Sequence, residues 1–460
     1  MKNSNRNSNN SKKNSNSKPA TKSSKKFKLK RNIGLVEATL YGVGIILGAG
    51  IYALIGAAAG VAGNALWISF IIGAVVAAFT GFSYAELSSM YPKEAAEYVY
   101  TKNAFKKNYL SFIVEWIMFF TTIISATTVA LGFAGYFSNL FGGNIVTIAA
   151  LLIGILSFLN YYGIKESAKY NNLSTIIEFS GLVLVIIAGL YYIPKYAFDG
   201  VGYIDFFAAK DGLHGIMTAT ALIFFAFIGF ENVANLSEET KNAKKVIPKA
   251  LLLSLVISAI LYVLVSVAAI GILGSDELAA SKGPLADVIN KVFPGAGYVL
   301  SIIALFATSN TVLVMLIIGS RLLYGLSCNN SLPAVCKVIG SRGTPYISVG
   351  IVGLLAIVGL FLGSIKKVAL LTDVGIFIVY LVVNLSLIVL RYKVSDSKRA
   401  YKAPLNIGRF SVTAFLGIIT CMIMLYFFEL ELILYEIAAL GVGFIIYLVF
   451  NSSKRVVNKG

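Results

Sequence analysis

The residues of this chain that could do chemistry are glycines and acids set inside long apolar runs. The first such run contains GVGIILGAGIY, with Gly42, Gly44, Gly48 and Gly50. Glycine costs a helix interior about 1 kcal/mol relative to alanine, so a purely structural spanning helix would avoid it. Unwound backbone inside a membrane is tolerated only where protein or a water-filled cavity satisfies its polar groups. The glycines therefore predict a helix break beside a cavity.

The two ends of such a break carry opposite partial charges. We expect the first half helix to end around 45–47 and the second to begin around Gly50. The carbonyls of the first end are partly negative and the amides of the second are partly positive, which together suit a zwitterion with an ammonium and a carboxylate group. Glycines also permit close packing of helices, and this stretch alone leaves both explanations open.

A second apolar run carries a similar signature. The stretch FFAFIGFENVANLSEETKNAKKVIPKA, residues 224–250, contains Gly229 in mid-span and Glu231 two residues later. An ionisable residue at that depth is energetically expensive and indicates a functional site. The two breaks are about 180 residues, or five spans, apart. Paired breaks at corresponding positions of two inverted halves are typical of the binding site of a secondary transporter.

The composition places these runs in a lipid membrane. Of the 460 residues, 57% are hydrophobic and 13% are charged, more apolar than a soluble protein of this size could cover. About 20 mostly apolar residues cross the hydrocarbon core as a helix. Twelve runs meet this criterion: 34–59, 65–88, 110–138, 144–161, 172–194, 213–236, 250–273, 296–320, 346–363, 368–390, 410–428 and 431–450. The predicted fold class is an all-α polytopic membrane protein with about 12 transmembrane helices.

The basic residues predict the topology. The first 31 residues hold eleven Lys and Arg and no acid, a composition that predicts a disordered, solvated tail, with binding to anionic lipid as the alternative. With the N-terminus inside, 33 of the 39 Lys and Arg lie in cytoplasmic segments. We therefore expect a multi-pass protein of the cell membrane with both termini cytoplasmic. No folded soluble module accompanies the basic charge, so nucleic acid is not an expected partner.

The sequence offers little material for a catalytic or metal site. The one histidine, His214, is at the outer mouth of the sixth span, and Cys328, Cys336 and Cys421 show neither disulfide nor metal spacing. We therefore expect no enzyme activity, no cofactor and no metal. A channel would favour an open polar path over one pair of breaks at mid-depth. An amino acid sensor built like a transporter stays an alternative, because sensing needs the same pocket.

Four stretches resemble signatures of the amino acid–polyamine–organocation superfamily. GVGIILGAGIY resembles the first-helix signature, and residues 224–250 resemble the sixth helix with its following loop. NYYGIKESAKYNNLSTIIEFSG (160–181) resembles the loop that enters the fifth helix, and GSRLLYGLSCNNSLP (319–333) resembles the end of the eighth. The resemblance covers residues 32 to about 450. It implies the LeuT-type fold, a 5+5 inverted repeat followed by two C-terminal helices.

The resemblance also implies a division of the chain and the residues of the pocket. Segment 1–31 would be the tail, 32–195 and 196–391 the two repeats, 392–450 the last two helices and 451–460 a cytoplasmic tail. The family's carboxylate-binding backbone falls on Gly48, Ala49 and Gly50, and its amine-binding carbonyls fall on Ile45, Ile46, Phe225, Ala226 and Ile228. Phe225 and Phe227 match aromatic residues that gate or line the pocket, with plain packing as the alternative. Glu231 matches an acid just beyond the break.

The coupling ion is the most open part of this prediction. In some proton-coupled relatives a lysine fifteen residues after the glycine of the GIKESA-like loop occupies the place of a sodium ion, and here that position is Glu178. Thr308 and Ser309 stand at the matching level of the eighth span, and their hydroxyl oxygens suit a small cation such as sodium. Glu178 could carry a proton, bind a cation or form a structural hydrogen bond.

The expected function is secondary active transport of amino acids across the cell membrane by alternating access, as proton-coupled uptake of neutral or broad-range L-amino acids. Exchange or uniport of cationic amino acids or polyamines is the alternative, because Glu231 gives a cationic substrate some support. The expected partners are the amino acid, a proton or sodium ion, and the lipid bilayer. Glu115 is expected to be a structural partner of a neighbouring helix, and Glu86 to end the second span in the headgroup region.

Overall fold

The computed structural model describes six stretches of the chain: 33–93, 95–162, 164–198, 204–328, 332–340 and 343–457. The basic segment 1–31, expected to be disordered, lies outside these residues, as does the side chain of Ala49. The described residues are mostly helical, and two short strands, β1 (Asn406–Ile407) and β2 (Phe410–Ser411), form an antiparallel hairpin.

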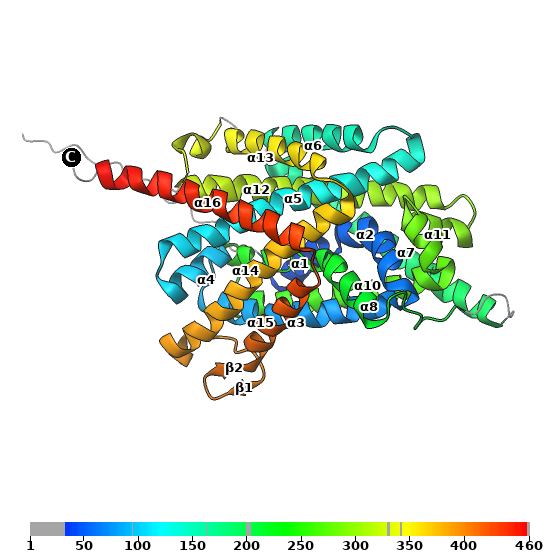
Figure 1. Ribbon diagram of the computed structural model, residues 1–460, viewed down its shortest axis with the longest axis horizontal. Helices are drawn as coiled ribbons and strands as arrows, with labels where there is room; N and C mark the ends of the chain where they lie inside the picture. Colours follow the sequence, from blue (N-terminus) through cyan, green and yellow to red (C-terminus); the bar gives the residue numbers. More distant parts are fainter. Residues whose placement is uncertain are drawn as a thin grey trace, which may run out of the picture. The chain divides into compact units, whose positions relative to one another are not determined.

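Figure 1 shows how the helices are arranged. The first part of the chain forms α1 (Leu35–Leu47), α2 (Ala49–Ala62), α3 (Leu66–Met90), α4 (Ala96–Phe105), α5 (Asn108–Phe141), α6 (Ile145–Tyr162) and α7 (Ile164–Phe198). The remainder forms α8 (Gly212–Ile223), α9 (Asn232–Asn235), α10 (Ala243–Ala280), α11 (Pro284–Val292), α12 (Gly297–Cys328), α13 (Tyr346–Gly359), α14 (Ile365–Lys393), α15 (Val412–Tyr426) and α16 (Leu430–Val457). Short 3₁₀ turns connect several of them, among them η2 (Phe224–Phe227) and η3 (Leu236–Glu238).

The predicted spans all appear as apolar helices. Nine helical stretches of the described chain are long and apolar enough to cross a membrane, and three shorter apolar helices accompany them: Leu35–Leu47, Tyr346–Leu362 and Val412–Tyr426. The first two predicted spans correspond to Leu35–Leu47 together with the stretch Gly50–Met90. The prediction of an all-α, multi-pass membrane protein is confirmed. The last helix differs in extent, because α16 continues past residue 450 to Val457.

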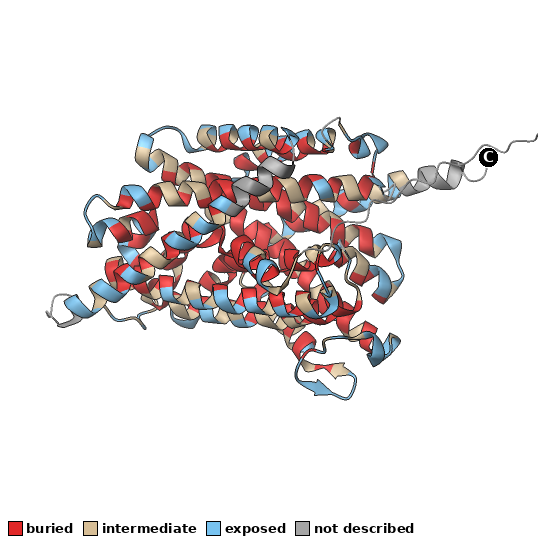
Figure 2. Cartoon of the chain, turned by 180° about the vertical axis from the view of Figure 1, so that it is seen from behind, coloured by how far each residue is buried: buried red, intermediate tan, exposed pale blue. Residues whose placement is uncertain are grey.

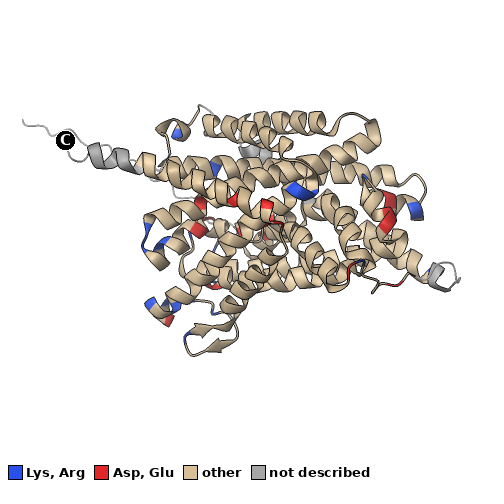
Figure 3. Cartoon of the chain, viewed as in Figure 1, with Lys and Arg blue, Asp and Glu red and all other residues tan. Residues whose placement is uncertain are grey.

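The packing separates a buried centre from a lipid-facing periphery. Helix α10 packs along α1, α2 and α3, while α5 packs against both α12 and α14. The outer helices α6, α13 and α16 expose large apolar side chains on one face, such as Leu151, Ile155 and Leu354 (Figure 2). Lipid tails are as apolar as these side chains, so this exposure carries no penalty in a bilayer. Charged segments are sparse along the helices and gather near α4 and the end of α14 (Figure 3).

Candidate functional site

The first helix is broken where the glycines predict. Gly48 separates α1 from α2, with φ −26° and ψ −153°. A Cβ atom on Gly48 would overlap the hydroxyl oxygen of Thr311, and one on Gly50 would overlap the Cα atom of Ala226. Both glycines are therefore required by close approach of other segments, and the Gly50 contact brings α2 directly against the second broken segment.

The second break follows the turn η2. Ile228 is extended, with φ −61° and ψ 136°, and Gly229 has φ +122°, a backbone conformation that is readily available only to glycine. A Cβ atom on Gly229 would lie 2.5 Å from Cγ2 of Ile45 on α1. The helix resumes as α9 from Asn232. The two breaks, about 180 residues apart in sequence, are thus in direct contact.

A tyrosine that sequence reasoning missed joins the two breaks. The hydroxyl of Tyr262, on α10, lies 2.9 Å from the carbonyl oxygen of Ala226 and within hydrogen-bonding reach of the carbonyl oxygen of Ile46. A hydroxyl has one proton, so it donates to one of these carbonyls at a time. Two of the five carbonyls assigned to an amine therefore share one donor, and a third, that of Phe225, accepts from the amide of Ile228 at 3.3 Å. The available signal was a tyrosine in the middle of an apolar span, since a buried tyrosine needs a partner.

Two adjoining cavities lie beside the breaks. The first has a volume of about 10 Å³ and is lined by both broken segments, α5 and α12: Ile45, Ile46, Gly48, Gly50, Ser125, Phe225, Ile228, Thr311 and Met315. The second, also of about 10 Å³, is lined by Met118, Thr121, Thr122, Ser125, Ile228, Glu231, Asn232, Met315, Ile318 and Ile376. They share Ser125, Ile228 and Met315. A cavity of this volume holds about one water molecule, so in this structure neither cavity is open widely enough for an amino acid.

Not every residue assigned to the pocket lines these cavities. Phe227 is fully buried and packs edge-on against Tyr262, with ring centroids 5.4 Å apart, as in the packing alternative. Ala226 contacts Gly50 through its backbone and lines neither cavity as described. The side chain of Ala49 lies outside the described residues. Phe225 does line the first cavity.

Glu231 holds the second break in place. The amide of Gly229 donates to both carboxylate oxygens, at 3.1 and 2.9 Å, and the hydroxyl of Tyr380 on α14 donates at 2.9 Å. The side-chain amide of Asn232 lies 3.5 Å from one oxygen. Since Glu231 is only 1% exposed, these donors replace the water that the carboxylate loses. The acid therefore positions the turn at Gly229 while lining the second cavity.

The predicted coupling residues Glu178, Thr308 and Ser309 are all buried, but the carboxyl group of Glu178 makes no hydrogen bond to either hydroxyl. Neither of its oxygens has a hydrogen-bond partner among the described residues, and its backbone carbonyl accepts from the hydroxyl of Tyr52 at 2.7 Å. Thr308 and Ser309 each donate to a carbonyl of their own helix, α12, at 2.7 and 2.6 Å. The structural hydrogen bond that was one alternative for Glu178 is thus not seen.

Sequence reasoning overlooked two further acids inside the predicted spans. Asp373 on α14 and Glu436 on α16 are at most 1% exposed, and none of their carboxyl oxygens is paired within the described chain. Glu115 is 5% exposed, and one of its oxygens also has no partner among the described residues, so the expected contact with a neighbouring helix is not made by that atom. The signal for all three is an acid inside an apolar run.

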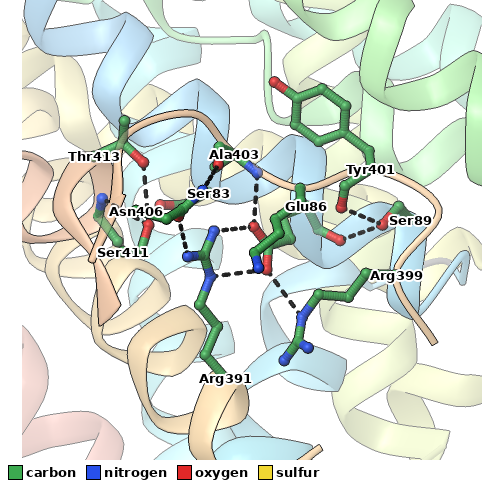
Figure 4. A network of polar contacts seen from close by, with 12 residues as sticks. Ser83, Glu86, Ser89, Arg391, Arg399, Tyr401, Ala403, Asn406, Ser411 and Thr413 are labelled. Carbon is green, nitrogen blue, oxygen red and sulfur yellow. Dashed lines mark hydrogen bonds and ion pairs between the residues drawn. The ribbon is translucent and has the colours of Figure 1, made fainter. Parts of the chain in front are cut away.

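Glu86 lies near the end of the second span, as expected, but it is buried in protein and has specific partners there. Its side chain is completely buried, and it accepts from Nε of Arg391 at 2.9 Å, pairs with Nε of Arg399 at 3.0 Å and accepts from the amide of Ala403 at 2.8 Å (Figure 4). The last turn of α14 supplies Arg391, and the segment that follows α14 supplies Arg399 and the amide of Ala403. A segment with six Lys and Arg, residues 391–409, was the available signal.

Aromatic rings connect the second cavity to α4. Tyr380, the donor to Glu231, packs edge-on against Tyr84 with ring centroids 5.9 Å apart, and the Tyr84 hydroxyl donates to Glu97 on α4 at 2.9 Å. Burial raises the pKa of Glu97 to about 7, and the nearby charge of Glu231 adds to this, while hydrogen bonds, including the one from Tyr84, oppose it. Among the described residues, no group of three or more His, Cys, Asp or Glu side chains could hold a metal ion.

Comparison with known proteins places this geometry in a family context. A model of the amino acid permease family matches residues 33–450, a range that includes both breaks and both cavities. The chain is 29% identical to the branched-chain amino acid permease BcaP of Bacillus subtilis, over 94% of this chain and 95% of the relative. It is 27% identical to the methylthioribose transporter of the same organism, over 95% and 96%. It is 29% identical to the vacuolar cationic amino acid transporter 4 of Arabidopsis thaliana, over 80% and 64%.

Proposed function

Because this chain belongs to the amino acid permease family, we propose that it takes up neutral L-amino acids across the cell membrane by alternating access. The observation that supports this most directly is the contact of two helix breaks beside a small cavity that both of them line. Backbone ends that lost their helical partners offer both donors and acceptors, which is what a zwitterion needs. Figure 1 shows α1 and α2 in the interior of the bundle, among longer helices.

The fold proposed for this mechanism is the 5+5 inverted repeat. Residues 32–195 and 196–391 would form the two repeats, and residues 392–450 the last two helices. The equivalent positions of the two breaks, five spans apart, support this division. The excess of Lys and Arg in alternate loops supports cytoplasmic termini.

Within the pocket, we assign the carboxylate of the substrate to the backbone at Gly48–Gly50, where α2 begins. Its ammonium group would meet the carbonyls of Ile45 and Ile228, because those of Ile46 and Ala226 face the Tyr262 hydroxyl and that of Phe225 accepts from the amide of Ile228. The side chain of the substrate would then extend into the second cavity, along the face of α5 that carries hydroxyl and methyl groups.

A neutral substrate fits the second cavity better than a cationic one. The carboxylate of Glu231 is the one acid that lines it, and the donors from Gly229 and Tyr380 already occupy both of its oxygens. A cationic side chain would have to compete with these internal hydrogen bonds. Because the similar proteins include one named for branched-chain and one named for cationic amino acids, the transport experiment includes both classes of substrate. Cationic substrates are the alternative.

Counterflow into proteoliposomes tests the transport proposal. Vesicles preloaded with unlabelled leucine should accumulate labelled leucine, and a panel of amino acids outside should compete, neutral ones more strongly than arginine, lysine or a polyamine. Binding without counterflow would indicate a sensor. Counterflow that arginine or putrescine inhibits and leucine does not would move the assignment to the cationic alternative.

For coupling, we propose that Glu178 carries a proton. Its fully buried carboxyl without a hydrogen-bond partner in the described residues has no structural contact to explain it. Glu178→Gln should lose the stimulation of uptake by an imposed pH gradient while substrate affinity stays within a few-fold, and Glu431→Gln, at a half-exposed acid, is the control. A variant that keeps the full response would make Glu178 structural. Wild-type uptake that follows a sodium gradient would instead indicate a cation site with Thr308 and Ser309.

A further inference from the structure

The hairpin of residues 404–411 presents apolar side chains away from the bundle. Ile407 of β1 pairs with Phe410 of β2, and the side chains of Leu405 and Ile407 are 62% and 74% exposed. Figure 1 shows the hairpin projecting beside α15, and Figure 2 shows its first strand as exposed. In water, two neighbouring side chains of this size would be costly to leave uncovered.

The base of the hairpin is held rigidly. Arg391, which is buried against Glu86, also donates to the side chain of Asn406 in β1, and the amide of Asn406 donates to the carbonyl of Ala403 at 2.7 Å (Figure 4). The amide of Ala403 in turn donates to Glu86. At the other end of the hairpin, Ser411 caps α15 by accepting from the amide of Ala414. The exposed tip is therefore presented in a defined position and is not a loose loop.

The helix that follows the hairpin is too short to cross the hydrocarbon core. Helix α15 has 15 residues, which span about 22 Å, whereas the core of a bilayer is about 30 Å thick. Its far end is marked by the highly exposed Tyr426, a residue type that prefers the interface. The missing length therefore falls at the hairpin end, where strands that rise about 3.3 Å per residue can supply it. Phe410 of the hairpin packs on the lipid-facing Phe415 of α15, which makes the apolar surface continuous.

The surroundings of the hairpin are basic. Six Lys and Arg and a single acid, Asp396, lie between residues 391 and 409. Arg391 and Arg399 are buried against Glu86, and the other four basic residues, Lys393, Lys398, Lys402 and Arg409, are exposed. Exposed cations beside an exposed apolar tip match a membrane surface in which phosphate groups lie above acyl chains.

We propose that the hairpin of residues 404–411 is an interfacial anchor for anionic lipid. Leu405 and Ile407 insert among the acyl chains, and Lys402 and Arg409 lie at the phosphate groups. The length of α15 and the exposed apolar tip indicate insertion into lipid, and the exposed basic residues indicate that the headgroups are anionic. The proposed topology places the hairpin at the cytoplasmic leaflet, and only this placement depends on the proposed function. The anchor itself depends on neither the substrate nor the coupling ion.

Electron paramagnetic resonance on the full chain in lipid nanodiscs tests the insertion. The exposed Cys328 is replaced by serine, and a nitroxide is attached to Ile407→Cys, to Leu405→Cys or, as the control, to Ser397→Cys at an exposed polar position nearby. Collisions with oxygen, which dissolves in hydrocarbon, are compared with those of a water-soluble nickel chelate. Both hairpin labels should collide severalfold more with oxygen than with the chelate, and the control should show the reverse. Chelate-accessible hairpin labels, or labels shielded from both reagents by protein, would overturn the proposal.

A second arm tests the anionic headgroup. The label depth at position 407 is measured in nanodiscs of phosphatidylcholine and of phosphatidylcholine mixed with phosphatidylglycerol, with and without Lys402→Gln and Arg409→Gln. Insertion should deepen with phosphatidylglycerol, and the double substitution should remove that increase. Equal depth in both lipids would overturn the assignment to anionic lipid. Transport need not be measured, so a failure here is separate from a failure of the proposed function.

Discussion

Replacing Glu86 with glutamine should destabilise this protein much more than removing an exposed acid, because two buried guanidinium groups lose their carboxylate. The side chains of Glu86, Arg391 and Arg399 are 0%, 2% and 2% exposed. Removing one partner of a buried pair costs about 3–5 kcal/mol. Arg399 keeps Asp396 as a partner, so the loss falls mainly on Arg391, and we expect about 3 kcal/mol, the lower end of that range.

The surface provides a matched control for this substitution. The ion pair of Lys367 with Glu431 has a nitrogen–oxygen distance of 2.9 Å, but its side chains are 34% and 50% exposed. Exposed pairs contribute about 0–1 kcal/mol, so Glu431→Gln should change stability little. A double variant, Glu86→Leu with Arg391→Met, should recover part of the loss, because apolar side chains of similar volume can replace a buried pair at little cost.

Reversible unfolding by sodium dodecyl sulfate in mixed micelles, followed by the fluorescence of the native tryptophans, gives the free energy of unfolding for each variant. The order of stability should be wild type close to Glu431→Gln, then the double variant, then Glu86→Gln. A loss for Glu86→Gln that matches the loss for Glu431→Gln would refute the reasoning, since it would mean that Glu86 is not the buried counter-charge of Arg391.

Three further predictions concern the site and its surroundings. Gly50→Ala should lower leucine uptake by about fivefold or more, because overpacking against Ala226 costs about 1–3 kcal/mol. Gly350→Ala has open space around it and should transport normally, and equal uptake by the two variants would contradict the contact. Tyr380→Phe removes one hydrogen-bond donor to the buried carboxylate of Glu231, and such a bond contributes about 1.5–3 kcal/mol. The value of kcat/KM for uptake should therefore fall by at least about tenfold. An unchanged value would mean that the Gly229 amide by itself is sufficient to hold the carboxylate. Because the pKa of Glu97 is raised from 4.5 to about 7, the folded state keeps a proton that the unfolded state releases, and stability should fall as pH rises through that window by at most about 3 kcal/mol. Thermal unfolding from pH 4.5 to 7.5 checks this, and the same slope in Glu97→Gln would assign it to another group.

Much of the local structure follows from the sequence because lipid imposes strict rules on it. A segment in hydrocarbon must satisfy its backbone internally, so each long apolar run predicts a helix. Glycine inside such a run predicts a break in the helix, and the helices do break at Gly48 and Gly229. The resemblance of the two glycine-containing stretches to a known family then made the contact between them expected before the structure was known.

The partners of the buried polar groups could not be predicted in the same way. Glu86 looked interfacial because its position along α3 is near the end, and hydropathy reports only such local position. Its partner Arg391 is 305 residues away, and only the packing of the end of α14 against α3 makes the pair. Tyr262 and Tyr380 likewise became meaningful through the carbonyls and the carboxylate that other helices bring to them.

Residues within single segments are enough to predict the membrane setting, the apolar helices and the positions of both helix breaks, since each depends on one segment in contact with lipid. Helix packing shows which carbonyls at the breaks already face a donor, which acids have partners among the described residues, and how the hairpin after α14 is presented. The physical reason is that a buried charge or hydroxyl is stabilised by whichever group lies within about 3 Å of it, and helix packing, not sequence proximity, brings that group there.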